Sequence, residues 1–243
     1  MSDRAHSRKH YEERLRSLKE KLLLMGHKAE TMVSDSIRAY EERRLSLAQE
    51  VIQRDRELDL LEREIDEHCL EILALDQPVA DDLRRVTSAF KMVKDLERIG
   101  DHSVIIAERA IESLHEPELE SGAGIGIMAI ETQKILKDSL DSLVFADVAL
   151  AETVIHTDRV IDVQYEHVFH DQLSWMSKER AAISRALGLI LVARSLERIG
   201  DHSVNIAEMV IFLAKGQDIR HGTHAAAPSL RERMPVEAVP TGR

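Results

Sequence analysis

The sequence predicts an all-α fold made of two tandem three-helix bundles that are related by an internal duplication. The duplication is directly visible, because the residues from Leu96 to Val104 recur letter for letter from Leu196 to Val204. Aromatic residues make up only 3% of the chain, and 10 glycines and 5 prolines leave long uninterrupted stretches, which is typical of long helices. The 243 residues can form two halves of roughly 100 residues, each large enough for its own core.

Three helices are expected in the first half, at about residues 8–43, 46–75 and 80–114. The first follows from apolar residues between Leu15 and Met32 that recur at alternating steps of three and four, which is a heptad seam. Ser46 and Gln49 have the spacing of a capping box and predict the start of the second helix. Pro78 ends that helix, because proline cannot continue it and disfavours the helical conformation in the preceding residue.

The second half is expected to repeat this plan. A fourth helix should cover about residues 127–145, and Asp147 should cap a fifth that ends near Ser177. A sixth should end at Lys215-Gly216, which is a good helix stop. We therefore expect a first repeat at residues 8–116, a second repeat at 120–215 and a disordered tail at 217–243, where no periodicity remains.

The composition also excludes several functions. A net charge of −11 argues against nucleic acid as a main partner, because a phosphate backbone requires a basic protein face. The single cysteine, Cys69, excludes an internal disulfide and lies on an apolar seam, where we expect it to be buried and inert. The N-terminus has no apolar signal core, and the longest apolar run, Ala186 to Ala193, is too short to span a bilayer. We therefore expect a cytoplasmic protein.

The repeated block carries charge as well as apolar residues. Glu97 and Asp101 in the first copy, and Glu197 and Asp201 in the second, are four residues apart, so each pair projects from one helix face. Two further acidic pairs have the same spacing on the preceding helices: Asp55 with Asp59, and Asp158 with Asp162. A duplicated fold needs only apolar periodicity, so identical acids in both copies indicate that both halves hold the same chemical site.

The positions of these pairs about the expected turns predict that they meet. In an antiparallel helical hairpin, residues equidistant from the turn lie level with each other. The first-half pairs centre on residues 57 and 99, so their midpoint is residue 78, in the expected turn. The second-half pairs centre on residues 160 and 199, and their midpoint of 179.5 again falls near the expected turn. Each half should therefore bring four carboxylates to one level.

Four carboxylates at one level repel one another, and a hard cation with oxygen ligands would compensate. We therefore predict two metal sites, and all-carboxylate ligands favour Mg, Ca, Mn or Fe. Glu62 and Glu166 lie on the same helix faces as the acids and could extend the sites. The missing side chains of Gly100 and Gly200 would let a metal cluster lie close to the backbone.

Two alternatives to a regulatory metal site remain at this point. The acids could form only salt bridges with nearby arginines, as is common on solvated helices. The chain could also be a carboxylate-bridged metalloenzyme, but such sites usually pair Glu with Glu-x-x-His. Glu112 and His115 alone have that spacing, at a helix end. His102 and His202 point about 100° away from the last acid and are expected beside the sites, with a structural role.

Together these residues resemble the PhoU family of phosphate-signalling regulators, from about Tyr11 to Ala214. The marker is an acid-x-x-x-Asp motif on the third helix of each repeat, supported by Asp76-Gln77-Pro78 and Asp82-Leu83-Arg84. The second repeat lacks the proline turn and the Asp-Leu-Arg segment, which leaves the equality of the two sites open.

The resemblance implies divalent or trivalent metal ions, such as Fe, Mn, Mg or Zn, in multinuclear clusters on the acidic motifs. It also implies a cytoplasmic adaptor without enzymatic activity, peripheral to the membrane through its partners only. Those partners would be the ATPase of a phosphate ABC transporter and a phosphate-sensing histidine kinase. The adaptor would repress the phosphate-starvation response and modulate phosphate uptake. A homodimer is expected as well, because long amphipathic bundles often self-associate.

Overall fold

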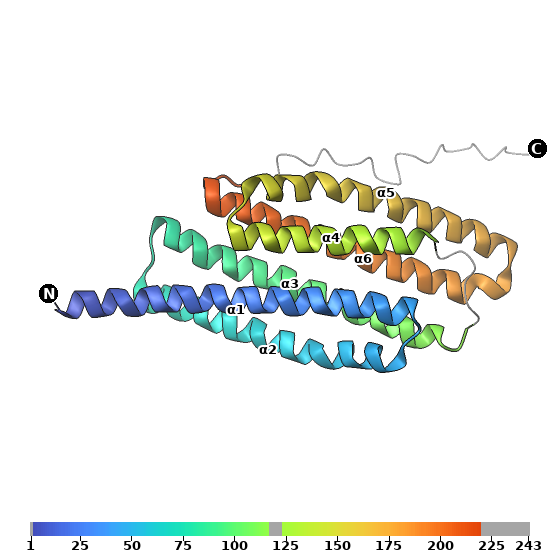
Figure 1. The fold of residues 1–243 in the computed structure, drawn as a ribbon, viewed down its shortest axis with the longest axis horizontal. Coiled ribbons are helices and arrows are strands. Elements are labelled where there is room, and N and C mark those ends of the chain that lie inside the picture. The colour runs from blue at the N-terminus through green and yellow to red at the C-terminus, as the bar shows by residue number, and fades with distance from the viewer. Residues whose placement is uncertain (1, 117–122, 220–243) are drawn as a thin grey trace, which may run out of the picture.

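The computed structural model describes residues 2–116 and 123–219 (Figure 1). Over these residues the chain forms six long α-helices and one short 3₁₀ helix, and the predicted all-α fold is confirmed. The elements are α1 Ser2–Glu41, α2 Leu45–Asp76, α3 Ala80–Ser113, α4 Ala123–Phe145, α5 Val148–Lys178, η1 Arg180–Ala182 and α6 Ile183–Lys215. Residues 117–122, which span the predicted boundary and the first residues of the predicted second repeat, lie outside the described residues, as does most of the predicted tail, from residue 220.

The helices form two bundles that lie side by side (Figure 1). Helices α1, α2 and α3 pack on one another, as do α4, α5 and α6. The two bundles meet mainly where α3 packs against α6, and to a lesser extent where α1 contacts α4. Among the described residues, α2 and α5 contact only elements of their own bundle. Helices α3 and α6 are therefore central, and α2 and α5 are peripheral.

The α1–α2 turn corrects one prediction. The capping box at Ser46 is wrong, because Arg44 is the N-cap residue of α2 and makes no side-chain cap bond. The turn is instead stabilised by Arg43, which adopts a left-handed backbone conformation with φ 53°. Its Nη2 atom donates to the carbonyl oxygens of Ser113 and Glu116, both at 2.7 Å. Because these acceptors lie at the end of α3, the local sequence does not reveal them.

Other helix ends follow their local chemistry. Asp147 is the N-cap of α5 as predicted, and its Oδ1 atom accepts from the backbone N–H groups of Ala149 and Leu150 at 3.0 and 3.1 Å. Gly216 ends α6 with a left-handed φ of 67°, also as predicted. Helix α4 begins at Ala123, before its predicted start at residue 127, because the glycines at 124 and 126 continue the helix and do not break it.

The predicted apolar seams form the core. On α2 the four seam residues are fully buried: Val51, Leu58, Ile65 and Ile72. Each such side chain contributes about 1.5–3 kcal/mol relative to an exposed one. Cys69 is also fully buried, as expected, and burial raises its pKa to about 12, so the thiol is unreactive at neutral pH. Within the described part of the chain, no helix has the length and apolar character needed to cross a membrane.

Candidate metal centres

The first group of acids lies between α2 and α3, at the level that the hairpin spacing predicts. Asp59, Glu62 and Glu97 place carboxylate oxygens within 4.8 Å of one another. Asp55 and Asp101 adjoin them, since the pKa of Asp55 is raised first by burial and then by the charges of Asp59 and Asp101. Burial likewise raises the pKa of Glu97, and the charge of Asp101 adds to the effect. We call these five acids the first-half group.

The second group lies between α5 and α6. Asp158, Asp162 and Asp201 place carboxylate oxygens within 4.8 Å of one another. Burial raises the pKa of Asp158 to about 7, and the charges of Asp162 and Asp201 contribute. Glu197 belongs to the same cluster, because its pKa is raised by burial and then by the charge of Asp201. These four acids are the second-half group. All eight acids singled out in the sequence therefore lie in two clusters, and Glu62 joins the first.

Two oxygens of the second-half group are buried without a hydrogen bond from any described residue. Asp158 is only 7% exposed, and its Oδ1 atom has no partner. The Oε2 atom of Glu197 also lacks a hydrogen bond, although Arg198 Nε lies 3.5 Å away. A buried polar atom without a partner costs about 1–3 kcal/mol, and more when it is charged. A bound cation would offset this cost.

The surroundings of the second-half group also have room for an ion. A cavity of about 240 Å³ is lined by Asp158, Asp201 and four neighbouring residues of α6. A water molecule occupies about 30 Å³ in the liquid, so an ion could retain several water ligands there. Oxygen-only donors, buried unpaired charge and adjacent space together fit a hard metal ion.

The two glycines beside the acids allow the helices to approach closely. A Cβ atom on Gly200 would lie 3.0 Å from Asp158 Oδ1 and 3.2 Å from Ile161 Cδ1. A Cβ atom on Gly100 would overlap the side chain of Leu58 and lie 3.5 Å from Asp55 Oδ1. The space over both glycines is thus filled by side chains of the neighbouring helix, and it holds a carboxylate in each half rather than an open place for a metal cluster.

Arginines contact some of the acids, as the salt-bridge alternative requires. Arg98 Nη1 lies 3.0 Å from Asp101 Oδ2, and Arg198 Nη1 lies 2.9 Å from Asp201 Oδ2. Both arginines also lie within 3.5 Å of the preceding glutamate. These contacts involve acids on the same helix as the arginine, and Asp158 on α5 still keeps its unpartnered oxygen. Arginine pairing therefore accounts for only part of each group.

Lys94 is a member of the first-half site that the sequence reasoning missed. Its ammonium group pairs with Glu62 and lies 3.6 Å from Asp66 Oδ2. Lys94 precedes Glu97 by three residues and so lies on the same helix face, which was the available signal. Glu166, the other acid expected to extend the sites, is exposed and does not belong to the second cluster.

The two histidines lie at the contact between the bundles. The rings of His102 and His202 have centroids 6.0 Å apart. His202 Nδ1 lies 2.9 Å from Asp95 Oδ1, which also accepts from Asn205 Nδ2 at 2.8 Å. Burial lowers the pKa of His102 to about 4, and the neighbouring His202 contributes. Their place at the α3–α6 contact agrees with the structural role expected for them.

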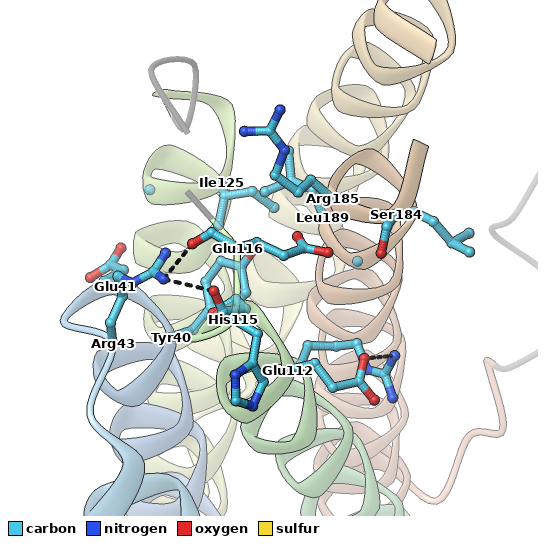
Figure 2. A pocket seen from close by; sticks show the side chains of 15 residues that line it. Tyr40, Glu41, Arg43, Glu112, His115, Glu116, Ile125, Ser184, Arg185 and Leu189 are labelled. Carbon is cyan, nitrogen blue, oxygen red and sulfur yellow. Dashed lines mark hydrogen bonds and ion pairs between the residues drawn. The ribbon is translucent and has the colours of Figure 1, made fainter. Parts of the chain in front are cut away.

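A larger cavity lies where α1 and α3 end and α4 and α6 begin (Figure 2). Its volume is about 660 Å³, and its lining includes Arg43 and Arg109 together with Glu112, His115 and Glu116. Glu112 pairs with Arg109, and within the described segments neither Glu112 nor His115 belongs to a cluster that could hold a metal. The Glu-x-x-His spacing at residues 112–115 thus provides no support for the metalloenzyme alternative.

Comparison with known proteins identifies the family. The PhoU domain matches residues 22–110 and 125–210. The chain is 39% identical over 217 residues to the phosphate-specific transport system accessory protein PhoU homolog of Pseudomonas aeruginosa, covering 89% of this chain and 90% of that protein. It is 35% identical over 210 residues to the PhoU accessory protein of Escherichia coli, covering 85% and 86%.

Solved structures of PhoU proteins match the fold of this chain as well. The crystal structure of PhoU from Pseudomonas aeruginosa matches with a TM-score of 0.83 and 39% identity, covering 85% of this chain and all of that one. The fold of the regulatory protein PhoU from Streptococcus pneumoniae matches with a TM-score of 0.79 at 24% identity, covering 86% and 98%. The relatives from Pseudomonas aeruginosa and Escherichia coli are named accessory proteins, which agrees with the prediction that this chain is not an enzyme.

Proposed function

The chain belongs to the PhoU family, and from that premise we propose that it represses the phosphate-starvation response when phosphate is plentiful. It would do so by coupling the ATPase of a phosphate ABC transporter to a phosphate-sensing histidine kinase, and it would also modulate phosphate uptake. The observation that carries the proposal is a 39% identity that extends over 89% of the chain, to a relative named for phosphate-specific transport.

Metal binding and assembly are parts of the same proposal. The eight predicted ligands are Asp55, Asp59, Glu97, Asp101, Asp158, Asp162, Glu197 and Asp201. They would hold divalent or trivalent ions (Fe, Mn, Mg or Zn) in one cluster per half, and the unpartnered oxygen of the buried Asp158 supports this assignment. The protein would act in the cytoplasm as a homodimer and reach the membrane only through its partners. Light scattering of the purified chain would test the dimer.

A phosphate-starvation reporter in phosphate-rich medium tests the regulatory role. Cells that lack the protein should show high reporter output, and the wild-type chain should restore repression. The variant Asp101→Asn with Asp201→Asn tests whether the acids matter, and Glu67→Gln, which changes an exposed acid of α2, is the matched control. Normal repression in cells without the protein would contradict the proposal. If the double variant still represses the reporter, Asp101 and Asp201 are not needed for the regulatory role.

A further inference from the structure

We propose that the two acid groups bind metal in a fixed order, the second-half group before the first-half group, because Lys94 already neutralises part of the first. This inference rests on the metal binding proposed above. The duplication predicts two equal sites, but the groups differ in burial, in charge and in the residues that surround them.

In the second-half group, negative charge is buried and incompletely paired. Asp158 is 7% exposed, and its Oδ1 atom lacks a hydrogen bond from any described residue. Glu197 Oε2 also lacks a hydrogen bond, although it lies 3.5 Å from Arg198 Nε. Arg198 approaches from α6 and contacts Asp201 and Glu197, and it leaves the Asp158 atom unpaired. An entering cation would meet unpaired charge beside an open cavity of about 240 Å³, so little protein–protein bonding has to be broken.

In the first-half group, the protein itself supplies a cation. The ammonium group of Lys94 pairs with Glu62, and Glu62 is one of the three acids whose oxygens converge. Asp66, the next acid on this face of α2, lies 3.6 Å from the same ammonium group. Lys94 therefore neutralises part of the charge of Glu62 and competes with a metal ion for this carboxylate. Asp55 is also more exposed than Asp158. Without a bound metal, its carboxylate therefore carries a smaller free-energy cost of burial.

The register of the duplication shows that this difference is built into the sequence. Because Asp55 corresponds to Asp158, the positions of Glu62 and Asp66 correspond to Tyr165 and Phe169. The second half thus has two aromatic rings with centroids 6.1 Å apart where the first half has a lysine-bridged pair of acids. The repeat kept the eight core acids and kept a cation at the position of Lys94, where the second half has Arg194, but it replaced the two acids that Lys94 contacts by aromatic residues.

Manganese titration of the purified, chelator-stripped full chain tests the order. Binding of Mn²⁺ followed by calorimetry should show a tighter and a weaker step. The variant Asp158→Asn should abolish the tighter step, and Asp59→Asn should abolish the weaker one. Because an exposed ion pair contributes at most about fivefold to an equilibrium constant, Lys94→Met should tighten the weaker step by up to about fivefold. Lys134→Met, on an exposed position of α4, should change neither step.

The possible failures are distinguishable. Two steps of equal affinity, or a tighter step that survives Asp158→Asn and disappears in Asp59→Asn, would overturn the order and leave metal binding intact. Absence of any binding in the folded wild-type chain would overturn the metal assignment and the order together. Circular dichroism of each metal-free variant identifies those that fail to fold. If an acid variant fails to fold, the comparison of Lys94→Met with Lys94→Arg still tests the proposal. Lys94→Arg keeps the cation and should leave the weaker step unchanged, and an equal effect of the two Lys94 variants would contradict the role given to the cation.

Discussion

Asp158 combines burial with several neighbouring negative charges, and burial is the main cause that raises its pKa to about 7. In the unfolded chain an aspartate has a pKa near 3.9. Between these values the folded protein binds a proton that the unfolded chain has released. Stability of the metal-free protein should therefore fall as pH rises from about 4 to about 7.

The variant Asp158→Asn should lose this component of the pH dependence, because asparagine does not titrate. Urea unfolding of the metal-free protein at pH 5 and pH 7.5 would measure it. Between pH 5 and pH 7.5, the free energy of unfolding should fall by more in the wild type than in the variant. Glu67→Gln serves as the control, since this acid is exposed. Equal pH dependence in the wild type and Asp158→Asn would show that the carboxylate is solvated or paired in the folded state.

Gly100 illustrates a second constraint at the scale of single residues. A Cβ atom there would overlap the terminal Cδ2 atom of Leu58, a fully buried side chain that would have to shift. Gly100→Ala should therefore destabilise the fold by about 1–3 kcal/mol, despite the better helix propensity of alanine. Gly188→Ala is the matched control, because no heavy atom lies within 4 Å of its added Cβ, and it should stabilise by up to about 1 kcal/mol. Equal effects in urea unfolding would contradict this view of the α2–α3 contact.

At the scale of elements, the sequence predicted helix ends correctly where they depend on hydrogen bonds between neighbouring residues. It did not predict contacts between residues on different helices. The Asp147 cap and the Gly216 stop depend on neighbouring residues, and both are confirmed. The predicted cap at Ser46 was wrong because Arg44 is the N-cap residue of α2, and the turn before it is stabilised by bonds from Arg43 to the end of α3. The role of Lys94 was missed for a similar reason, since its partner Glu62 belongs to another helix. The acid pairs were an exception, because residues equidistant from the turn of an antiparallel hairpin lie level, so their long-range contact follows from their positions in the sequence.

The α3–α6 contact joins the two bundles through an asymmetric set of polar bonds. Asp95 accepts from Asn205 and contacts His202, but the position equivalent to Asp95 in the second half is Ser195. Asp95→Ala should remove both contacts and destabilise the protein by about 0.5–1.5 kcal/mol, because Asn205 is exposed and can bond to water instead. Asp95→Asn keeps an acceptor and should cost less. Unfolding midpoints in urea would measure both, and no loss in Asp95→Ala would show that the bundles are held together by apolar packing alone.

At the scale of the whole molecule, each acid group lies between a central helix and a peripheral one. Metal bound to the first-half group would link α2 to α3, and metal bound to the second-half group would link α5 to α6. Because α2 and α5 contact only their own bundle within the described structure, such links would fix helices that are otherwise held mainly by apolar packing. Ligand that binds only the folded state adds about 2.7 kcal/mol at a hundredfold excess over Kd. Metal should therefore raise the unfolding temperature, and a chelator should lower it.

If the duplicated acids are cation sites of a PhoU-family regulator, the protein purified from its own host should contain metal at both acid groups. Elemental analysis by mass spectrometry should find tightly bound metal in the wild-type chain and in Glu67→Gln. It should find most of that metal lost from a folded Asp158→Asn, Asp201→Asn variant, with the remainder lost when Asp59→Asn and Asp101→Asn are added. Equal metal content in all folded variants, or no metal in the wild type, would contradict the assignment of these acids as metal ligands.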